Sequence, residues 1–421
     1  MHMRPQPCQD PIVPAGADDA AGISAQLRQR LAPQLWPLPL ALLPAGCAVV
    51  GGAVRDGLLG RLAARPDLDL VVPSGAIALC QRLARQLGGS AVVLDDTRDI
   101  ARLVLKGWSF DLAACEGANL EIDLRRRDYS VNAMALPLDP ESDLLDPCGG
   151  LDALARRELA AISEANLLSD PLRLLRGLRL ACELGFTLNA QSRAWIEQHR
   201  SGLAAVASER VLAELEKLAC AAGGAHGLLQ VAQSGLLAPW LSHGSTLEPP
   251  LSALDLGRAA ALGLSSDEQA WALPLARMAC LADAEALQQL RSSRALQKQV
   301  QRLRQAWELV AGRRLDALPE AERFALHRSV EAELPALLLL LPADQELGAL
   351  LARWRDGADP LCHPRPPCDG TTLQSLLGLK AGPQLGELLT HLSQERAFGR
   401  LAADSDAAAV ISAARRWHER Q

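Results

Sequence analysis

Two neighbouring stretches decide the fold, Cys47-Ala48-Val49-Val50-Gly51-Gly52-Ala53-Val54-Arg55-Asp56 and Asp67-Leu68-Asp69-Leu70-Val71-Val72. In the first, apolar β-branched residues run into paired glycines, which predicts a strand that turns into a helix. Glycines at such a turn let backbone N–H groups approach an anion, the helix N-terminus favours negative charge, and Arg55 adds a fixed cation. A phosphate fits there, although an ordinary tight turn is the alternative when the motif stands alone.

The second stretch places two carboxylates on one side of a strand. Side chains alternate along a strand, so Asp67 and Asp69 project from the same face and can share a hard cation that prefers oxygen ligands. A solvated strand edge is the alternative, but it would suit a polar alternation. The flanking residues Leu68 and Leu70 are apolar, so we place the pair at the rim of a buried sheet.

Other short apolar runs complete a small α/β region. The sequence predicts five strands and one intervening helix, at 47–50, 68–72, 91–94, 101–105 and 109–113, with the helix at 76–87. Asp111 lies inside the last strand, and an acid in such a place needs a partner, for which a metal ion is one candidate. Transfer of a phosphoryl or nucleotidyl group by two metal ions requires a carboxylate set of this kind.

Two basic motifs follow the strands. In the stretch 121–135 the arginines Arg126 and Arg127 suit phosphate oxygens, while Asp128 and Asn132 can hold a sugar hydroxyl. A charged helix start explains this stretch equally well when it is taken alone. In the stretch 169–181 the sequence predicts a capped helix with a cationic stripe beside an apolar one, formed by Arg173, Arg176 and Arg179.

The composition bounds the remaining possibilities. The chain has 421 residues, 49% of them hydrophobic and 22% charged, which predicts a globular protein of about two to four domains. Ten cysteines in so long a chain favour reduced thiols and a cytoplasmic location. The uncharged stretch 31–54 contains four prolines, so we expect no membrane insertion. The net charge of −6 does not by itself indicate a nucleic-acid partner.

Taken in order, these motifs resemble the class II tRNA nucleotidyltransferase and bacterial poly(A) polymerase family, within the polymerase-β-like nucleotidyltransferases. The resemblance covers residues 46–218 and 370–400, and between them the chain matches only as helix. The motifs that carry it are those at 51–56, 67–69, 126–133, 146–152, 170–173, 208–215 and 377–387.

The resemblance implies an α+β protein, with a small mixed-sheet nucleotidyltransferase head followed by an all-α neck, body and tail. We expect an N-terminal arm and lead-in helix and four further parts, at 1–44, 45–158, 159–225, 226–350 and 351–421. It also implies magnesium-dependent addition of nucleotides to the tRNA 3′ end from CTP and ATP, with release of pyrophosphate and with no obligate protein partner. The alternatives are a poly(A) polymerase of the same family and an RNA-binding protein that retains the fold without catalysis.

Residue by residue, the resemblance assigns Asp67 and Asp69 to the catalytic magnesium ions, with Asp111 as a candidate third carboxylate. It assigns the triphosphate to Gly51, Gly52 and Arg55, beside Asp56, and the ribose to Asp128 and Asn132. In the family, protein side chains read the incoming base instead of a template. The matching residues are Asp170 and Arg173, and we group with them, as nucleotide-binding, Arg126, Arg127, Arg176 and Arg179.

Two departures from the family pattern bear on specificity. Ser169 replaces a glutamate that in the family helps to orient the base-reading arginine. Only residues 112–124 separate the strand of Asp111 from the arginines at 125–127, which is short for the flexible loop of full CCA-adding members. Members without this loop tend to add only the two cytidines, so we expect CC addition, with full CCA addition as the alternative.

The RNA is expected along the helical remainder. Residues 288–315 contain seven basic side chains and only Glu308 as an acid, and contacts to a phosphate backbone need such a surface. A solvated helix face is an equally good interpretation. The residues predicted to bind RNA are Arg291, Arg294, Lys298, Arg302 and Arg304, with Lys380 beside the helix that Gly382-Pro383-Gln384 opens.

Overall fold

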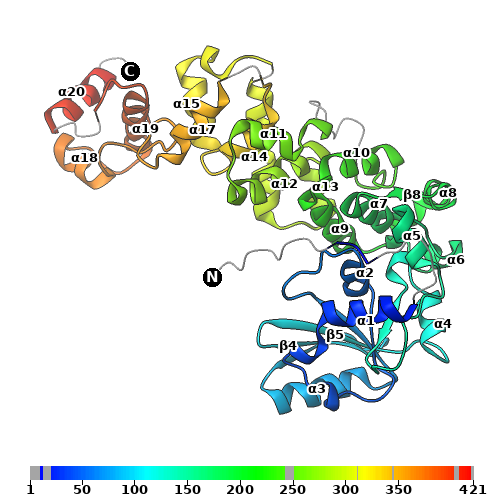
Figure 1. The fold of residues 1–421 in the computed structure, drawn as a ribbon. Coiled ribbons are helices and arrows are strands. Elements are labelled where there is room, and N and C mark those ends of the chain that lie inside the picture. The colour runs from blue at the N-terminus through cyan, green and yellow to red at the C-terminus, as the bar shows by residue number, and fades with distance from the viewer. Residues whose placement is uncertain are drawn as a thin grey trace. The chain divides into compact units, whose positions relative to one another are not determined.

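The computed structural model describes residues 10–12, 20–241, 251–310, 312–343, 346–402 and 407–418. The chain divides into two compact units, residues 1–206 and 207–421 (Figure 1). This division falls inside the stretch 159–225 that we expect to be one helical neck, and the five-part organisation stays a prediction. Most of the predicted N-terminal arm, residues 1–9 and 13–19, lies outside the described residues.

The first unit is built on a six-stranded sheet of order β3-β4-β5-β2-β1-β6. All neighbours are antiparallel except β2 and β5, which run parallel. The five predicted strands are confirmed, with ends that shift by at most one residue. The strands are β1 (Ala48–Val50), β2 (Leu68–Val72), β3 (Ser90–Asp95), β4 (Ile100–Leu105), β5 (Trp108–Ala114) and β6 (Ala135–Pro137).

The two faces of this sheet are covered differently. Helix α3 (Ala76–Leu87), which the sequence predicts with the same ends, packs on β3, β4 and β5 (Figure 1). On that face β4 contributes Ala101, Leu103 and Leu105, each at most 1% exposed. On the opposite face Val104 is 40% exposed. Alternation along β4 therefore separates a buried face from an open one.

Among the described residues, a packed cluster covers the opposite face near β1 and β2. There a core cluster joins strand residues Val50 and Val71 to Leu124, which belongs to α4 (Leu120–Arg125). Because Val50 pairs with Asp69 across the two strands, the predicted metal-binding carboxylate lies beside this cluster. The sheet therefore presents a half-covered face with Asp69 at the border between its closed and open parts.

Helices and short strands complete the first unit. The predicted lead-in helix is α1 (Ala20–Leu31), and the helix after the paired glycines is α2 (Gly52–Leu58). The short strands β7 (Glu158–Leu159) and β8 (Thr187–Leu188) pair in parallel. The remaining helices are α5 (Gly150–Arg156), α6 (Glu164–Ser169), α7 (Leu172–Leu184) and α8 (Ala190–His199).

The second unit is helical throughout its described residues. Its most buried helix, α16 (Leu334–Leu340), packs on α12 (Ser266–Leu281), as expected for an apolar run too short to cross a membrane. The other helices are α9 (Ser208–Cys220), α10 (Gly224–Ser234), α11 (Leu256–Leu262), α13 (Ala284–Gln289), α14 (Arg294–Val310), α15 (Glu320–Ser329), α17 (Leu347–Arg355), α18 (Gly370–Leu377), α19 (Pro383–Ala397) and α20 (Ala407–His418).

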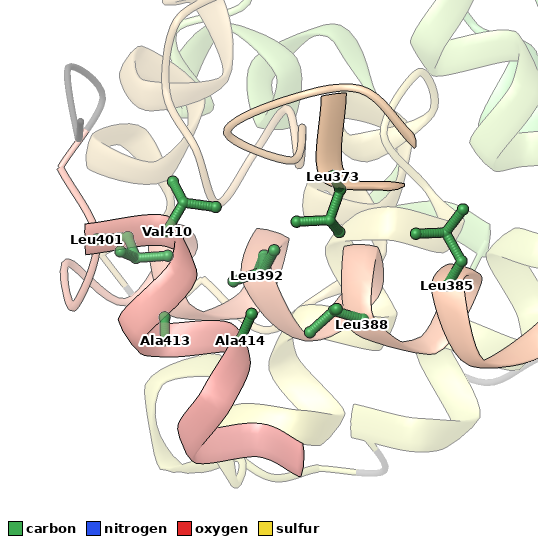
Figure 2. Close-up of a cluster of buried hydrophobic side chains, with 8 residues drawn as sticks. All are labelled: Leu373, Leu385, Leu388, Leu392, Leu401, Val410, Ala413 and Ala414. Atoms are coloured by element: carbon green, nitrogen blue, oxygen red, sulfur yellow. The ribbon is translucent and has the colours of Figure 1, made fainter. Parts of the chain in front are cut away.

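The last three helices have a core of their own. Leu373 of α18, Leu392 of α19 and Val410 of α20 point toward one another and are at most 3% exposed (Figure 2). Helix α19 begins at Pro383, as predicted from the Gly-Pro pair, since proline suits the first turn of a helix. Within the expected helical tail, α18, α19 and α20 therefore form a small packed cluster.

Among the described residues, no helix has both the length and the apolar composition that a membrane crossing requires.

Candidate active site

The site begins where β1 meets β2. Gly51 follows β1 with φ +70°, and a Cβ atom there would lie 3.0 Å from Oδ2 of Asp69 and 3.6 Å from Nη1 of Arg127. A left-handed conformation and so close an approach both favour glycine. The first glycine of the pair thus lets the turn, the carboxylate and the guanidinium meet at one point.

Asp69 is a carboxylate in an environment that disfavours its charge. Burial raises its pKa, and the neighbouring Asp111 and Asp67 raise it further, while Arg127 and Arg176 act in the opposite direction. The net pKa lies above the usual range for aspartate. A cation bound between these oxygens would relieve the repulsion, because an opposite charge favours the ionised form.

The two carboxylates suit a hard divalent cation whose remaining ligands come from substrate and water. Asp67 is exposed and lies just before β2, two residues from Asp69 on the same side of the strand. The described residues contain no group of three or more acidic, histidine or cysteine side chains placed to hold a metal ion. Magnesium is commonly held by one or two carboxylates together with substrate phosphates and water, and Asp67 and Asp69 match that arrangement.

The candidate third carboxylate, Asp111, lies beside Asp69 but has a partner of its own. The two aspartates are paired in register across β2 and β5. Asp111 also accepts two hydrogen bonds from Arg102 of β4, at 2.7 Å from Nε and 2.8 Å from Nη2. The sequence interpretation missed Arg102, because only the antiparallel register of β4 and β5 reveals that it faces Asp111.

On the β1 side of Asp69, a network fixes the predicted triphosphate arginine. Arg55 donates from Nε and Nη2 to both oxygens of Asp56, each at 2.9 Å. It also donates from Nη1 to the Asn132 side-chain oxygen at 2.5 Å. A Cβ at Gly52 would lie 3.5 Å from Arg55 Nη2. Four predicted nucleotide-binding residues are therefore joined in one place.

Asp128 is buried and has several donors around it. Burial alone would raise its pKa, but Arg176, the Tyr129 backbone N–H and Arg173 outweigh burial, and the net pKa is lowered. Arg176 Nε lies 2.9 Å from Asp128 Oδ2, and Asn132 Nδ2 lies 3.5 Å from Oδ1. The predicted ribose pair is thus in contact, and residues 130–132 form a single 3-10 turn.

The other two arginines of this motif pair with acids. Arg126 lies 2.8 Å from Glu116 and Arg127 lies 3.1 Å from Asp123. The Nε atom of Arg127 is buried and has no hydrogen-bond partner among the described residues. This donor belongs to the guanidinium whose Nη1 faces Gly51, and a buried donor without a partner is the kind of group that an anionic ligand would satisfy.

Arg173, the arginine predicted to read the base, is held by backbone oxygens. Arg173 Nη1 donates to the carbonyls of Asn166 at 2.9 Å and Arg126 at 3.0 Å, whereas Ser169 Oγ lies at 3.4 Å. The carbonyl oxygens therefore do most of the orienting that a glutamate at position 169 would supply. Asp170 ends α6 and accepts from the backbone N–H of Leu172 at 3.3 Å.

Two residues that the sequence interpretation missed support this arrangement. Asn166 donates from Nδ2 to the carbonyls of Arg125 and Arg127, at 2.8 and 2.7 Å. The fully buried Tyr129 donates to the Arg173 carbonyl at 2.9 Å, and Gly177 leaves room for its ring. Tyr129 could have been singled out from the sequence, because it is the one tyrosine of the chain.

The arginine stripe of α7 divides between two environments. Arg176 is 44% exposed and pairs with Asp128. One turn further, Arg179 is 9% exposed and lies 2.5 Å from Glu183, four residues ahead on the same helix. The structure therefore joins Arg173 and Arg176 to the predicted nucleotide-binding cluster, while Arg179 has an acidic partner of its own.

In the structure, some of the basic side chains in the predicted RNA-binding stretch around α14 are paired with acids from elsewhere in the chain. Arg291 pairs with Glu209 at 2.7 Å and Arg302 with the buried Glu333. Arg304 donates to the Ala279 carbonyl at 2.9 Å. Acids distant in sequence supply the counter-charges, which a local count omits. Within the described chain, Arg294, Lys298 and Lys380 are exposed.

Taken together, a mixed sheet, a glycine turn beside paired aspartates and an adjoining arginine cluster define a nucleotidyltransferase head. Comparison with known proteins agrees. Residues 47–160 match the family described as poly A polymerase head domain. Residues 185–246 match a probable RNA- and SrmB-binding site of polymerase A, and residues 262–411 match tRNA nucleotidyltransferase domain 2.

Individual relatives extend over nearly the whole chain. A CC-adding tRNA nucleotidyltransferase of Synechocystis sp. is 35% identical over 91% of this chain and 96% of its own. An A-adding tRNA nucleotidyltransferase of Deinococcus radiodurans is 33% identical over 90% of this chain and 98% of its own. The Thermotoga maritima CCA-adding enzyme, solved in complex with tRNA, has the same fold, with a TM-score of 0.70 and 21% identity over 94% of this chain and 98% of its own.

The chain belongs to the tRNA nucleotidyltransferase family. The predicted fold class, a mixed-sheet head with a helical remainder, and the predicted family are both confirmed.

Proposed function

We propose that this enzyme adds the two cytidines of the tRNA 3′ end, using CTP. The attacking group is the RNA 3′-hydroxyl, the bond formed joins it to the α-phosphate of CTP, and pyrophosphate leaves. The observation that carries the catalytic part is the meeting of Gly51, Asp69 and Arg127 at one point. A glycine turn, a carboxylate and an unmatched guanidinium donor there suit a metal-bound triphosphate.

The residues divide the work as their contacts suggest. Asp67 and Asp69 would hold Mg²⁺, which supplies charge neutralisation at the triphosphate and lowers the pKa of the attacking hydroxyl. Arg55 and Arg127 would bind phosphate oxygens, and Asp128 with Asn132 would accept and donate at the ribose hydroxyls. Asp170 and Arg173 would present the edge that recognises the base.

The choice of CC addition is supported by the short connection after β5. Strand β5 ends at Ala114 and α4 begins at Leu120, so residues 115–119 are the whole link. The resemblance associates such a short link with CC addition, and a CC-adding relative matches along the full chain. The A-adding relative makes A addition the second candidate. The proposed substrate places the enzyme in the cytoplasm.

The test uses three tRNA transcripts, ending at the discriminator base, after one cytidine and after two. With labelled CTP, we expect the first to gain two nucleotides, the second one and the third none. With labelled ATP, we expect no incorporation into any of them. Addition of ATP to the third transcript would overturn CC specificity, and runs of ATP on all three would favour a poly(A) polymerase.

A further inference from the structure

One face of the head carries exposed apolar side chains that the proposed nucleotide site does not use. Val92 of β3 is 50% exposed and Val104 of β4 is 40% exposed. Val93 and Leu94, at an irregularity of the β3–β4 register, are 45% and 47% exposed, so apolar exposure continues along this edge strand. Exposed apolar side chains that cluster in this way usually mark an interaction surface.

This apolar face continues directly into the active site. Across the sheet, Val92 pairs with Arg102, Arg102 with Asp111, and Asp111 with Asp69. Residues paired in register project from the same face of a sheet. The open face therefore forms one row that runs from the edge strand, through a cation, to the metal-binding carboxylates.

The sheet order fixes which reactant can occupy that row. The triphosphate residues Gly51 and Arg55 follow β1, on one side of Asp69, whereas β5, β4 and β3 lie on the other side. In nucleotidyl transfer the attacking oxygen and the leaving pyrophosphate are in line on opposite sides of the phosphorus atom. The attacking 3′-hydroxyl must therefore approach over β5, from the side of β4 and β3.

We propose that the open face of β3 and β4, formed by Val92, Val104 and Arg102, is the surface on which the last nucleotides of the RNA acceptor end lie. The two valines pack against base or sugar, which buries apolar surface. Arg102 contacts the backbone phosphate while it holds Asp111. This inference rests on the proposed function and names the acceptor subsite of the same reaction.

The charge and the edge geometry favour RNA over a second copy of this chain. The Arg102 fork to Asp111 uses Nε and Nη2, and the side chain is 42% exposed, which leaves Nη1 available to a phosphate. The register irregularity at Val93/Asp95 interrupts β3, and such bulges oppose strand addition at a sheet edge. A surface of bases and phosphates matches both the apolar and the cationic part of the row.

The test measures where the acceptor end lies and what it contributes. A photoreactive benzoylphenylalanine replaces Val92 in the full chain, and the tRNA ending at the discriminator base is the probe. We expect crosslinks that map to its last two nucleotides. The same group at Leu35, a residue 74% exposed and outside the sheet, should give none. Crosslinks only to another copy of the chain, to a distant part of the tRNA, or to nothing would overturn the proposal.

Steady-state kinetics provide the second measurement. We expect Val92→Asp/Val104→Asp to raise KM for tRNA about tenfold, because apolar packing against base or sugar is lost and phosphate is repelled, with KM for CTP changed less than about twofold. The milder Val92→Ala/Val104→Ala serves if the first variant does not fold, and Leu35→Asp is the matched control. Unchanged KM for tRNA in the alanine variant overturns the proposal.

Different results contradict the acceptor surface and the proposed function. A wild-type chain that incorporates CTP while the variants keep its KM for tRNA contradicts only the acceptor surface. A wild-type chain that incorporates neither CTP nor ATP into any of the three transcripts contradicts the proposed function itself.

Discussion

Two aspartates of the head, Asp69 and Asp128, have pKa values that are shifted in opposite directions. Both are substantially buried, and burial raises the pKa of each. Around Asp69 the neighbouring carboxylates Asp111 and Asp67 raise the pKa further. Around Asp128 the cations and a backbone donor reverse the shift, so that its pKa is lowered.

The difference indicates what each region is built to receive. The carboxylate region around Asp69 is short of positive charge until a cation binds, whereas the Asp128 region is already neutralised and held rigid by Arg176. A region of the first kind gains stability with its ligand, and one of the second kind contributes stability to the free protein. Substitutions at Asp69 and at Asp128 test this difference.

The largest effect is expected at Asp69. Replacing Asp69 by Asn should lower kcat by at least about a thousandfold, since one of the two carboxylates proposed to hold Mg²⁺ is lost. The Tm of the metal-free variant should be equal to or above that of the wild type, because a buried charge that the fold disfavours has been removed. Added Mg²⁺ should raise Tm only in the wild type.

Asp152→Asn provides the control, since this acid is 69% exposed and pairs with Arg156 on the surface of α5. It should leave both kcat and the magnesium response unchanged. A clear fall in the metal-free Tm of Asp69→Asn would show that the fold already satisfies this carboxylate, which would remove the contrast with Asp128.

At Asp128 the same substitution should have the reverse effect on stability. Asp128→Asn loses the ion pair with Arg176 and should reduce the free energy of unfolding by about 2 kcal/mol at pH 7. A lowered pKa contributes stability above the unfolded-state pKa, and this contribution is lost as the pH falls through the folded-state value. Urea unfolding at pH 7 and at successively lower pH should therefore show the two proteins converging in acid. A difference that persists at low pH would refute the charge-based explanation.

The Asp128 region also depends on a glycine. In Gly177→Ala, the new Cβ would lie 2.0 Å from Oη of Tyr129, whose backbone N–H binds Asp128. We expect a loss of about 2 kcal/mol, measured by urea unfolding, because overpacking displaces a buried ring. Gly386→Ala in α19, where a Cβ meets nothing within 4 Å, should instead stabilise by about 0.5–1 kcal/mol. Equal effects at both sites would exclude the steric account.

The smallest effect is a change in KM for tRNA, expected at the exposed cations of α14. A cation of the same helix that pairs with a buried acid provides the comparison. Arg294→Gln/Lys298→Gln removes two exposed cations and should raise KM for tRNA about fivefold while reducing its salt dependence, with little change in Tm. Arg302→Gln leaves the buried Glu333 without its cation and should mainly destabilise the fold, by about 2–3 kcal/mol. If the first variant keeps the wild-type KM for tRNA, RNA lies elsewhere.

Much of the head was predictable because its signals are local. The alternation of apolar residues located β2 and β4, and the Gly51–Gly52 turn located the start of α2. Two aspartates two residues apart in a strand must share a face, whatever the rest of the fold does. The helical second unit was predictable in the same way, from spacing alone.

What the sequence did not predict depends on pairing. Strand β6 has only three residues, and it exists because Ala135–Pro137 pairs with β1. Arg102 faces Asp111 through the β4–β5 register, and Glu333 neutralises Arg302 from 31 residues away. Neither relation has a local signature, so the local charge of α14 overstated its available charge.

The register between β2 and β5 also determines where this chain can change length. A deletion or insertion of one residue in β5 ahead of Asp111 would turn Asp111 from the face that it shares with Asp69 toward α3, since side chains alternate. Residues 115–119 lie beyond the last paired position and before α4. Insertions there leave the alignment of Asp69 with Asp111 intact. Evolution can therefore lengthen or shorten this link, to which we attribute the proposed choice of nucleotide, without rebuilding the sheet.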